Sequence, residues 1–214
     1  MYYKYPVDLF GYLCYILNMA KYNIQIQFFV ETPVFTAAEA RAAGIPSRML
    51  AHFCKKGIIE RVARGVYKGS QAKVDIDFQW EDLALVAMSI PHGVICLISA
   101  LCYYELTDQI MRQFWIAIPH ASKSPQRAKT RIIRMRNIDL GQTEIQVGTY
   151  QLKIFDRERT VIDSFRYLSK EIAIKALQAY LRQSGSAKPN LNKLMKYAKV
   201  LRVDIHPYIM ALTT

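Results

Sequence analysis

The clearest pattern of apolar and polar positions lies in residues 35–67, where it predicts two short helices. Thr36 and Glu39 have the spacing of a capping box, in which the Thr hydroxyl accepts from a backbone amide and the Glu side chain reaches back. An Ala-rich stretch continues this helix, and residues 44–46 (Gly-Ile-Pro) interrupt it. Ser47 is then placed to cap a second helix.

This second helix, expected over residues 48–56, is followed by a change to strand-like spacing. Gly57 is expected to end the helix, because glycine adopts the left-handed conformation that often follows a helix C-terminus. Strands are expected over residues 58–62 and 66–67, with a turn at residues 63–65. A helix, a tight turn, a helix and a β-hairpin in this order predict a winged helix-turn-helix, whose second helix enters the DNA major groove.

The rest of the chain predicts further helices and strands. Residues 7–30 form a mostly apolar run with interspersed tyrosines, which predicts one helix or two, and the polar residues 71–79 are expected to be a linker. Beyond it, helices are predicted over residues 80–89, 99–106 (capped by Ser99), 156–167, 171–183 and 191–200, and strands over 114–118, 130–135 and 144–155 with a turn at Gly148. The predicted fold class is α+β. A winged helix-turn-helix domain with an extended N-terminal helical segment (residues 1–70) precedes a mixed α/β domain (residues 80–214).

The charge balance favours a polyanionic partner. The chain has 29 Lys and Arg against 17 Asp and Glu, a net charge of +12, and an excess of this size favours nucleic acid or an anionic membrane surface. Residues 1–70 carry a net +5 and residues 121–214 a net +11, whereas residues 71–120 carry −4. Two basic regions on either side of an acidic one predict two separate functional surfaces.

The cysteines argue against a metal site, and the apolar runs argue against a membrane-spanning segment. The 4 cysteines form no Cys-x-x-Cys pair and have no histidine at zinc-finger spacing, so we expect reduced core residues and no metal site. The apolar runs at residues 9–17 and 94–104 are shorter than the roughly 20 residues that span a bilayer. The sequence therefore predicts a cytoplasmic protein without a membrane partner.

The predicted second helix carries the first group of candidate binding residues. Leu50, Phe53 and Cys54 share one face, which predicts the buried side. On the other side, an arginine can bond guanine bidentately and a lysine can reach a base or a phosphate. The candidate DNA-binding residues are Ser47, Arg48, His52 and Lys55 on the helix, with Arg61 and Arg64 on the wing. The alternative is a solvated basic face without function.

A second basic element lies at residues 123–136, where no acidic residue interrupts the cations. It is a candidate phosphate-binding or antitoxin surface, because a dense run of one sign favours contact with a nucleic-acid backbone. Its members are Lys123, Arg127, Lys129, Arg131, Arg134 and Arg136. The alternative is a solvated edge strand, where such residues discourage aggregation.

The segment 156–163 contains two carboxylates on one predicted helix face. The favoured interpretation is structural: Asp156 caps the helix, and Arg159 forms an ion pair with Asp163 one turn later. A metal-dependent nuclease using Asp156 and Asp163 is the alternative. No phosphate-binding loop, nucleophile elbow or zinc-protease motif is present, so we expect a protein that is not an enzyme and needs no cofactor.

Three segments together resemble the AbiEi antitoxin family, which comprises transcriptional regulators of abortive-infection (phage-defence) systems and partners of nucleotidyltransferase toxins. They are FTAAEARAAGIPSRMLAHFCKKGIIERVARGVY at 35–67, ISALCYYELT and FWIAIP at 98–107 and 114–119, and FDRERTVIDSFRYL at 155–168. The winged-helix segment alone has low specificity, and its combination with the other two is far more specific. One departure is that roughly 30 tyrosine-rich residues precede the winged helix.

The resemblance implies a repressor that binds inverted repeats in the operator DNA of its own operon, with a C-terminal antitoxin domain. The implied partner is a cognate nucleotidyltransferase toxin or its RNA substrate, in a type IV toxin–antitoxin system. The alternative is an RNA- or toxin-binding protein that acts through the basic C-terminal domain, with the winged helix as a scaffold.

Overall fold

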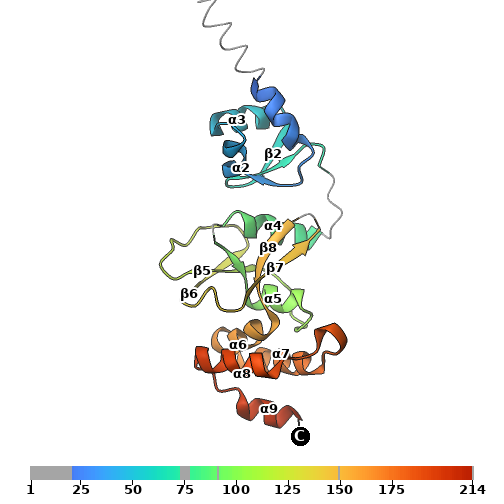
Figure 1. Ribbon diagram of the computed structural model, residues 1–214, viewed down its shortest axis with the longest axis vertical. Helices are drawn as coiled ribbons and strands as arrows, with labels where there is room; N and C mark the ends of the chain where they lie inside the picture. Colours follow the sequence, from blue (N-terminus) through green and yellow to red (C-terminus); the bar gives the residue numbers. More distant parts are fainter. Residues whose placement is uncertain (1–20, 73–77, 91, 149, 214) are drawn as a thin grey trace, which may run out of the picture. The chain divides into compact units, whose positions relative to one another are not determined.

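The computed structural model describes residues 21–72, 78–90, 92–148 and 150–213 (Figure 1). The chain divides into two compact units, residues 1–77 and 78–214. Most of the apolar N-terminal run lies outside the described residues, but residues 21–30 are helical, as predicted. The linker predicted at residues 71–79 also falls largely outside them, and helix α4 already begins at Phe78.

The first unit is a winged helix-turn-helix. After helix 21–30 come β1 (Phe35–Thr36), α2 (Ala37–Ala42), α3 (Ser47–Lys55), β2 (Ile59–Ala63) and β3 (Val66–Gly69). The three strands are antiparallel neighbours in the order β1-β3-β2. The predicted α+β class, with a winged helix before a mixed domain, is confirmed.

Aromatic and aliphatic side chains from every helix fill the core of this unit. Phe35, Leu50 and Phe53 are almost completely buried, and the Phe35 ring contacts the rings of Phe29 and Tyr67. Helix 21–30 ends directly against β3, where a Cβ on Gly69 would collide with backbone oxygens of the helix. Glycine is therefore required at this close approach.

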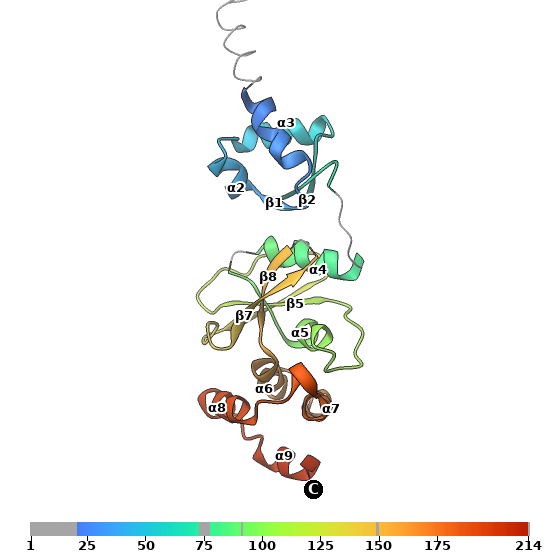
Figure 2. The same cartoon turned by 45° about the vertical axis from the view of Figure 1, so that its right-hand side comes forward.

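The second unit contains a five-stranded mixed sheet in the order β6-β5-β4-β8-β7. Its elements are α4 (Phe78–Met88), β4 (Val94–Ile95), α5 (Leu97–Tyr103), β5 (Phe114–Pro119), β6 (Thr130–Met135), β7 (Gln142–Val147) and β8 (Tyr150–Phe155). Strands β5 and β6 run parallel, as do β4 and β8, whereas β4–β5 and β7–β8 are antiparallel. In both views α4 covers one face of the sheet and α5 the other (Figures 1 and 2).

A helical layer follows the sheet. It contains α6 (Arg157–Tyr167), α7 (Lys170–Arg182), a short 3₁₀ turn (Gly185–Ala187), α8 (Leu191–Leu201) and α9 (His206–Thr213). Apolar side chains of α5, α6, α7 and α8 form one buried cluster. Helix α6 directly follows the interior strand β8, so its polar N-terminal residues lie between the sheet and the other helices.

Two predicted helix caps are wrong. Helix α3 begins at Ser47 itself, its N-cap is Pro46, and no side chain caps it. Helix α5 begins at Leu97, and Ser99 is buried inside it, where its hydroxyl accepts a hydrogen bond from the backbone amide of Trp115 at 2.9 Å. Both serines have favourable capping chemistry, but the backbone enters each helix earlier than local propensity indicates. No residue pattern in the sequence predicted β1, β4 or α9.

Candidate nucleic-acid interface

The helix-turn-helix is fixed at its first helix by a capping box, as predicted. The Thr36 hydroxyl accepts from the Glu39 amide at 3.2 Å, and the Thr36 amide donates to the Glu39 carboxylate at 2.6 Å. Gly44 in the following turn has a φ of +87°, and a Cβ there would lie 2.9 Å from the Gln25 side chain. The turn therefore needs glycine both for its backbone conformation and for its contact with helix 21–30.

The second helix ends in a Schellman motif, which sets where its basic last turn lies. Gly57 has a φ of +68° and donates to the carbonyl of Cys54, while the next amide, of Ile58, donates to the carbonyl of Phe53 at 3.1 Å. Lys55 and the C-cap Lys56 lie here, at the negative end of the helix dipole, where cations are favourable.

One face of α3 is an exposed stripe without acidic residues. Ser47, Arg48, Ala51 and Lys55 are all exposed, and they lie on neighbouring turns of the helix. The opposite face is buried through Met49, Leu50 and Phe53. Ala51 was missed in the sequence analysis, although its position four residues before Lys55 places it at the centre of the stripe. We call Ser47, Arg48, Ala51 and Lys55 the α3 stripe.

His52 lies at the border of the α3 stripe and is only half-exposed. Its ring contacts the ring of Phe53 edge-on at 5.8 Å between centroids. Its Nε2 atom is buried and has no hydrogen-bond partner among the described residues. The imidazole therefore packs partly against the core, in contrast to the fully exposed Arg48 one turn earlier.

The wing carries its two arginines in different settings. Arg64 is exposed in the turn between β2 and β3, beside Gly65, whose carbonyl accepts from the first amide of α2 at 2.8 Å. Arg61 is also exposed, at the third of the five positions of β2. Burial raises the pKa of the Cys54 thiol on α3, and the charge of Arg61 opposes this rise. Arg61 therefore lies near the end of α3, and Arg64 at the tip of the wing.

The second basic element does not form one surface. Strand β6 is at the edge of the sheet, and Arg131 and Arg134 are three residues apart in it, so they point to opposite faces. Arg127 donates from its guanidinium to the hydroxyl and the carbonyl of Ser89, at 2.9 Å each, so it ties its loop to the end of α4. The other members are exposed in the loops before and after β6: Lys123, Lys129 and Arg136.

The structural interpretation of segment 156–163 is confirmed. Asp156 is the N-cap of α6 and accepts from the Arg159 amide at 2.8 Å. Arg159 is fully buried, and its Nε lies 2.7 Å from Asp163. The same guanidinium donates to the carbonyls of Asn137 and Leu140. These side chains therefore hold the sheet, the 137–140 loop and α6 together.

Two further observations bear on function. Among the residues that the structure describes, no group of three or more His, Cys, Asp or Glu side chains could hold a metal ion. Within the same residues, every helix is too short or too polar to cross a bilayer.

Comparison with known proteins relates part of the first unit to a protein family. No curated protein matches the chain. Residues 25–67 match the family model described as "Transcriptional regulator, AbiEi antitoxin". The match runs from helix 21–30 into β3 and includes both helices of the helix-turn-helix. The winged helix of this chain is therefore similar to that of the AbiEi antitoxin transcriptional regulators.

Proposed function

We propose that the chain is a transcriptional repressor that binds operator DNA at its own operon through the α3 stripe. The observation that carries the proposal is the stripe itself: two exposed cations on the second helix of the motif, with no acidic residue anywhere in α3. The second helix of a helix-turn-helix reads base edges in the major groove. The family match over residues 25–67 supports the same role.

Each part of the unit has a role in this proposal. Arg48, in the first turn of α3, is placed to bond a guanine bidentately, and the methyl group of Ala51 suits contact with a thymine methyl. Lys55 and the wing residue Arg64 contact phosphates on either side. The small side chain of Ala51 matters because it lets the helix approach the floor of the groove.

We propose further that the second unit makes the chain a cytoplasmic antitoxin of a type IV system, countering a nucleotidyltransferase toxin. In this proposal the protein acts by binding and not by catalysis. The antitoxin role is supported only by the description of the family model, which matches residues 25–67 of the first unit. Action by binding is supported in the second unit by Asp156, Arg159 and Asp163, whose side chains bond one another and neighbouring groups within the fold.

The test is fluorescence anisotropy on the DNA immediately upstream of the gene, with a scrambled duplex of the same composition as the control. We expect tight, sequence-selective binding by the full chain. Arg48→Ala is expected to weaken it by about 1–3 kcal/mol, or roughly 5- to 150-fold. The matched control is Lys196→Ala, which removes one exposed charge from α8 and should leave operator affinity within about twofold.

Two results would reject the repressor proposal. One is equal binding of both duplexes with a steep salt dependence, since this is the behaviour of a basic protein without base contacts. The other is a loss of affinity in Lys196→Ala as large as that in Arg48→Ala.

A further inference from the structure

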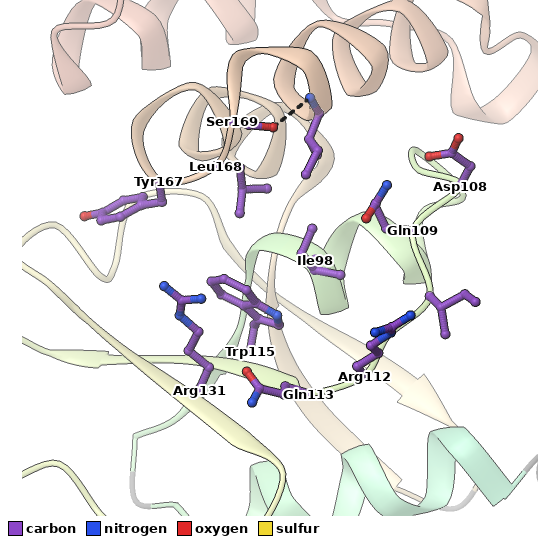
Figure 3. Close-up of a pocket in the computed structure, with 12 residues that line it drawn as sticks. Ile98, Asp108, Gln109, Arg112, Gln113, Trp115, Arg131, Tyr167, Leu168 and Ser169 are labelled. Carbon is purple, nitrogen blue, oxygen red and sulfur yellow. Dashed lines mark hydrogen bonds between the residues drawn. The ribbon is translucent and has the colours of Figure 1, made fainter.

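An open groove of about 850 Å³ lies in the second unit, between the edge of the sheet and the turn that joins α6 to α7 (Figure 3). It brings together cations, amides and aromatic rings from three segments far apart in the sequence. Its polar and aromatic lining residues include Gln109, Arg112, Gln113, Trp115, Arg131 and Tyr167. Its volume falls in the range of small-ligand sites, roughly 300–1,000 Å³.

Strand pairing fixes one side of the groove. Trp115 on β5 and Arg131 on β6 are direct partners in the parallel pair, so both side chains project from the same face of the sheet. The Arg131 guanidinium lies over the Trp115 ring, with its carbon 4.3 Å from the ring centroid. This cation–π contact holds the guanidinium beside the ring, and Arg131 as a whole remains exposed.

Arg112 supplies the second cation from the loop between α5 and β5. Figure 3 shows Arg112 and Arg131 on either side of Trp115. The loop is held locally, since the Gln109 carbonyl accepts from the Cys102 thiol at 3.3 Å and the Gln109 amide donates to Thr107 at 3.2 Å. Neither arginine forms a salt bridge with a carboxylate of the described residues.

The acidic side chain at the groove is already paired. Asp108 lies 3.9 Å from Lys175, which also binds Glu171 at 3.1 Å. Opposite, Tyr167 exposes 36% of its surface at the end of α6. The groove therefore presents two guanidinium groups that form no ion pair within the described residues, beside the partly exposed ring of Tyr167. It lies on a part of the chain separate from the α3 stripe.

We propose that this groove binds single-stranded nucleic acid. Guanidinium groups at its two sides suit successive phosphates, and unpaired bases stack on aromatic rings or on the flat face of an arginine. The amides of Gln109 and Gln113 are placed to bond base edges. Duplex DNA fits this site poorly, because its bases are stacked inside the helix and are not free to enter a groove of this size. The proposal does not depend on repression by the α3 stripe.

The test uses the full chain with Arg48→Ala and Lys55→Ala, so that the α3 stripe does not contribute to binding. Anisotropy is measured with labelled ten-nucleotide oligouridylate RNA and oligothymidylate DNA. Adding Arg112→Ala and Arg131→Ala should weaken binding at least about tenfold and reduce its salt dependence. The matched control removes two other exposed charges, through Arg182→Ala on α7 and Lys196→Ala on α8, and should change affinity less than about twofold.

A second readout places the ligand at Trp115. The chain has two tryptophans, Trp80 and Trp115, and Trp80→Phe keeps an aromatic ring against Tyr103. Fluorescence of the Trp80→Phe protein should therefore be quenched when an oligonucleotide stacks in the groove. Tighter binding of RNA than of DNA would identify RNA as the ligand through its 2′-hydroxyl. Equal loss of affinity in the groove and control variants, or unchanged Trp115 fluorescence at saturation, would overturn the proposal.

Discussion

Arg48 and Arg159 both lie in the first turn of a helix, yet their surroundings are opposite. Arg48, the second residue of α3, is exposed and has no acidic neighbour in its helix. Arg159, the third residue of α6, is fully buried. Its guanidinium bonds Asp163 and two backbone carbonyls and lies 4.5 Å from the centroid of the Phe155 ring. One arginine is available to a ligand, whereas the other is part of the core.

This difference shows that the net charge of +12 does not locate a binding site by itself. A buried arginine must be paired and hydrogen-bonded, because an unpaired charge in the interior is very costly. An exposed arginine without partners keeps its donors for a ligand. The basic run 123–136 shows a weaker form of this contrast, since Arg127 is half-buried and bonds Ser89, while Arg131 and Arg134 are exposed.

The largest expected effect comes from removing the buried arginine. Among the described residues, Arg159→Ala leaves the buried Asp163 carboxylate with Arg166 as its one charged partner, so we expect a loss of about 3–5 kcal/mol in the free energy of unfolding of the second unit. Urea denaturation followed by tryptophan fluorescence measures this, because both tryptophans lie in residues 78–214.

The control for this variant is Arg166→Ala. Arg166 binds the same carboxylate at 2.7 Å, but its side chain is 30% exposed, so we expect a smaller loss of about 1 kcal/mol. Equal losses in the two variants would show that the buried position of Arg159 has no special importance and would remove the contrast with Arg48.

A smaller effect, on binding and not on stability, is expected at the α3 stripe. Ala51→Glu places a negative charge at its centre, where it would face the DNA backbone and bases, so operator affinity should fall at least about 100-fold. The free energy of unfolding of the Ala51→Glu protein should differ from that of the original chain by less than about 0.5 kcal/mol. Alanine and glutamate both favour helices, and position 51 is exposed.

The matched control is Ala211→Glu, which adds the same charge at an exposed position of α9 in the other unit. Its operator affinity should stay within about threefold of the original. If Ala51→Glu bound the operator as well as this control did, the α3 stripe would not face DNA.

Sequence patterns predicted the two helices and the hairpin of the winged helix because these signals are local, although the Ser47 cap was wrong and β1 was missed. The Thr36–Glu39 capping box, the Gly44 turn and the Gly57 helix end each depend on residues within one or two turns. Strand β6 was also predicted with its observed bounds, Thr130–Met135. The central strand β4 was missed because it has only two residues, and these extend an apolar run that continues into α5.

The groove was beyond sequence reasoning for a different reason. Trp115 and Arg131 meet only through the β5–β6 register, and Tyr167 reaches the groove from a helix that begins after two more strands. Contacts between residues that are distant in the chain leave no recognisable pattern among neighbouring residues of the sequence. The Arg159–Asp163 ion pair, by contrast, was predicted from its spacing of four residues, although its complete burial was not.

The smallest expected effect tests a second buried contact at the start of α6. The Tyr197 hydroxyl donates to the Asp156 carboxylate at 3.0 Å, and Lys193 binds the same oxygen at 3.0 Å. Burial, followed by the charge of Asp156 and this hydrogen bond, raises the pKa of Tyr197 to about 12. Tyr197→Phe should lower the free energy of unfolding by about 1 kcal/mol at neutral pH, because one hydrogen bond is lost.

The pH dependence separates this contact from simple packing. An unfolded tyrosine has a pKa of about 10, so between pH 10 and 12 the folded state holds a proton on Tyr197 that the unfolded state releases. Stability should therefore decrease as the pH rises through this window, and less steeply in Tyr197→Phe. The control is Tyr208→Phe, because the Tyr208 ring packs on Phe165 and its hydroxyl forms no hydrogen bond that the described residues show. Identical alkaline slopes in the original chain and in Tyr197→Phe would show that the contact with Asp156 does not keep Tyr197 protonated in the folded state.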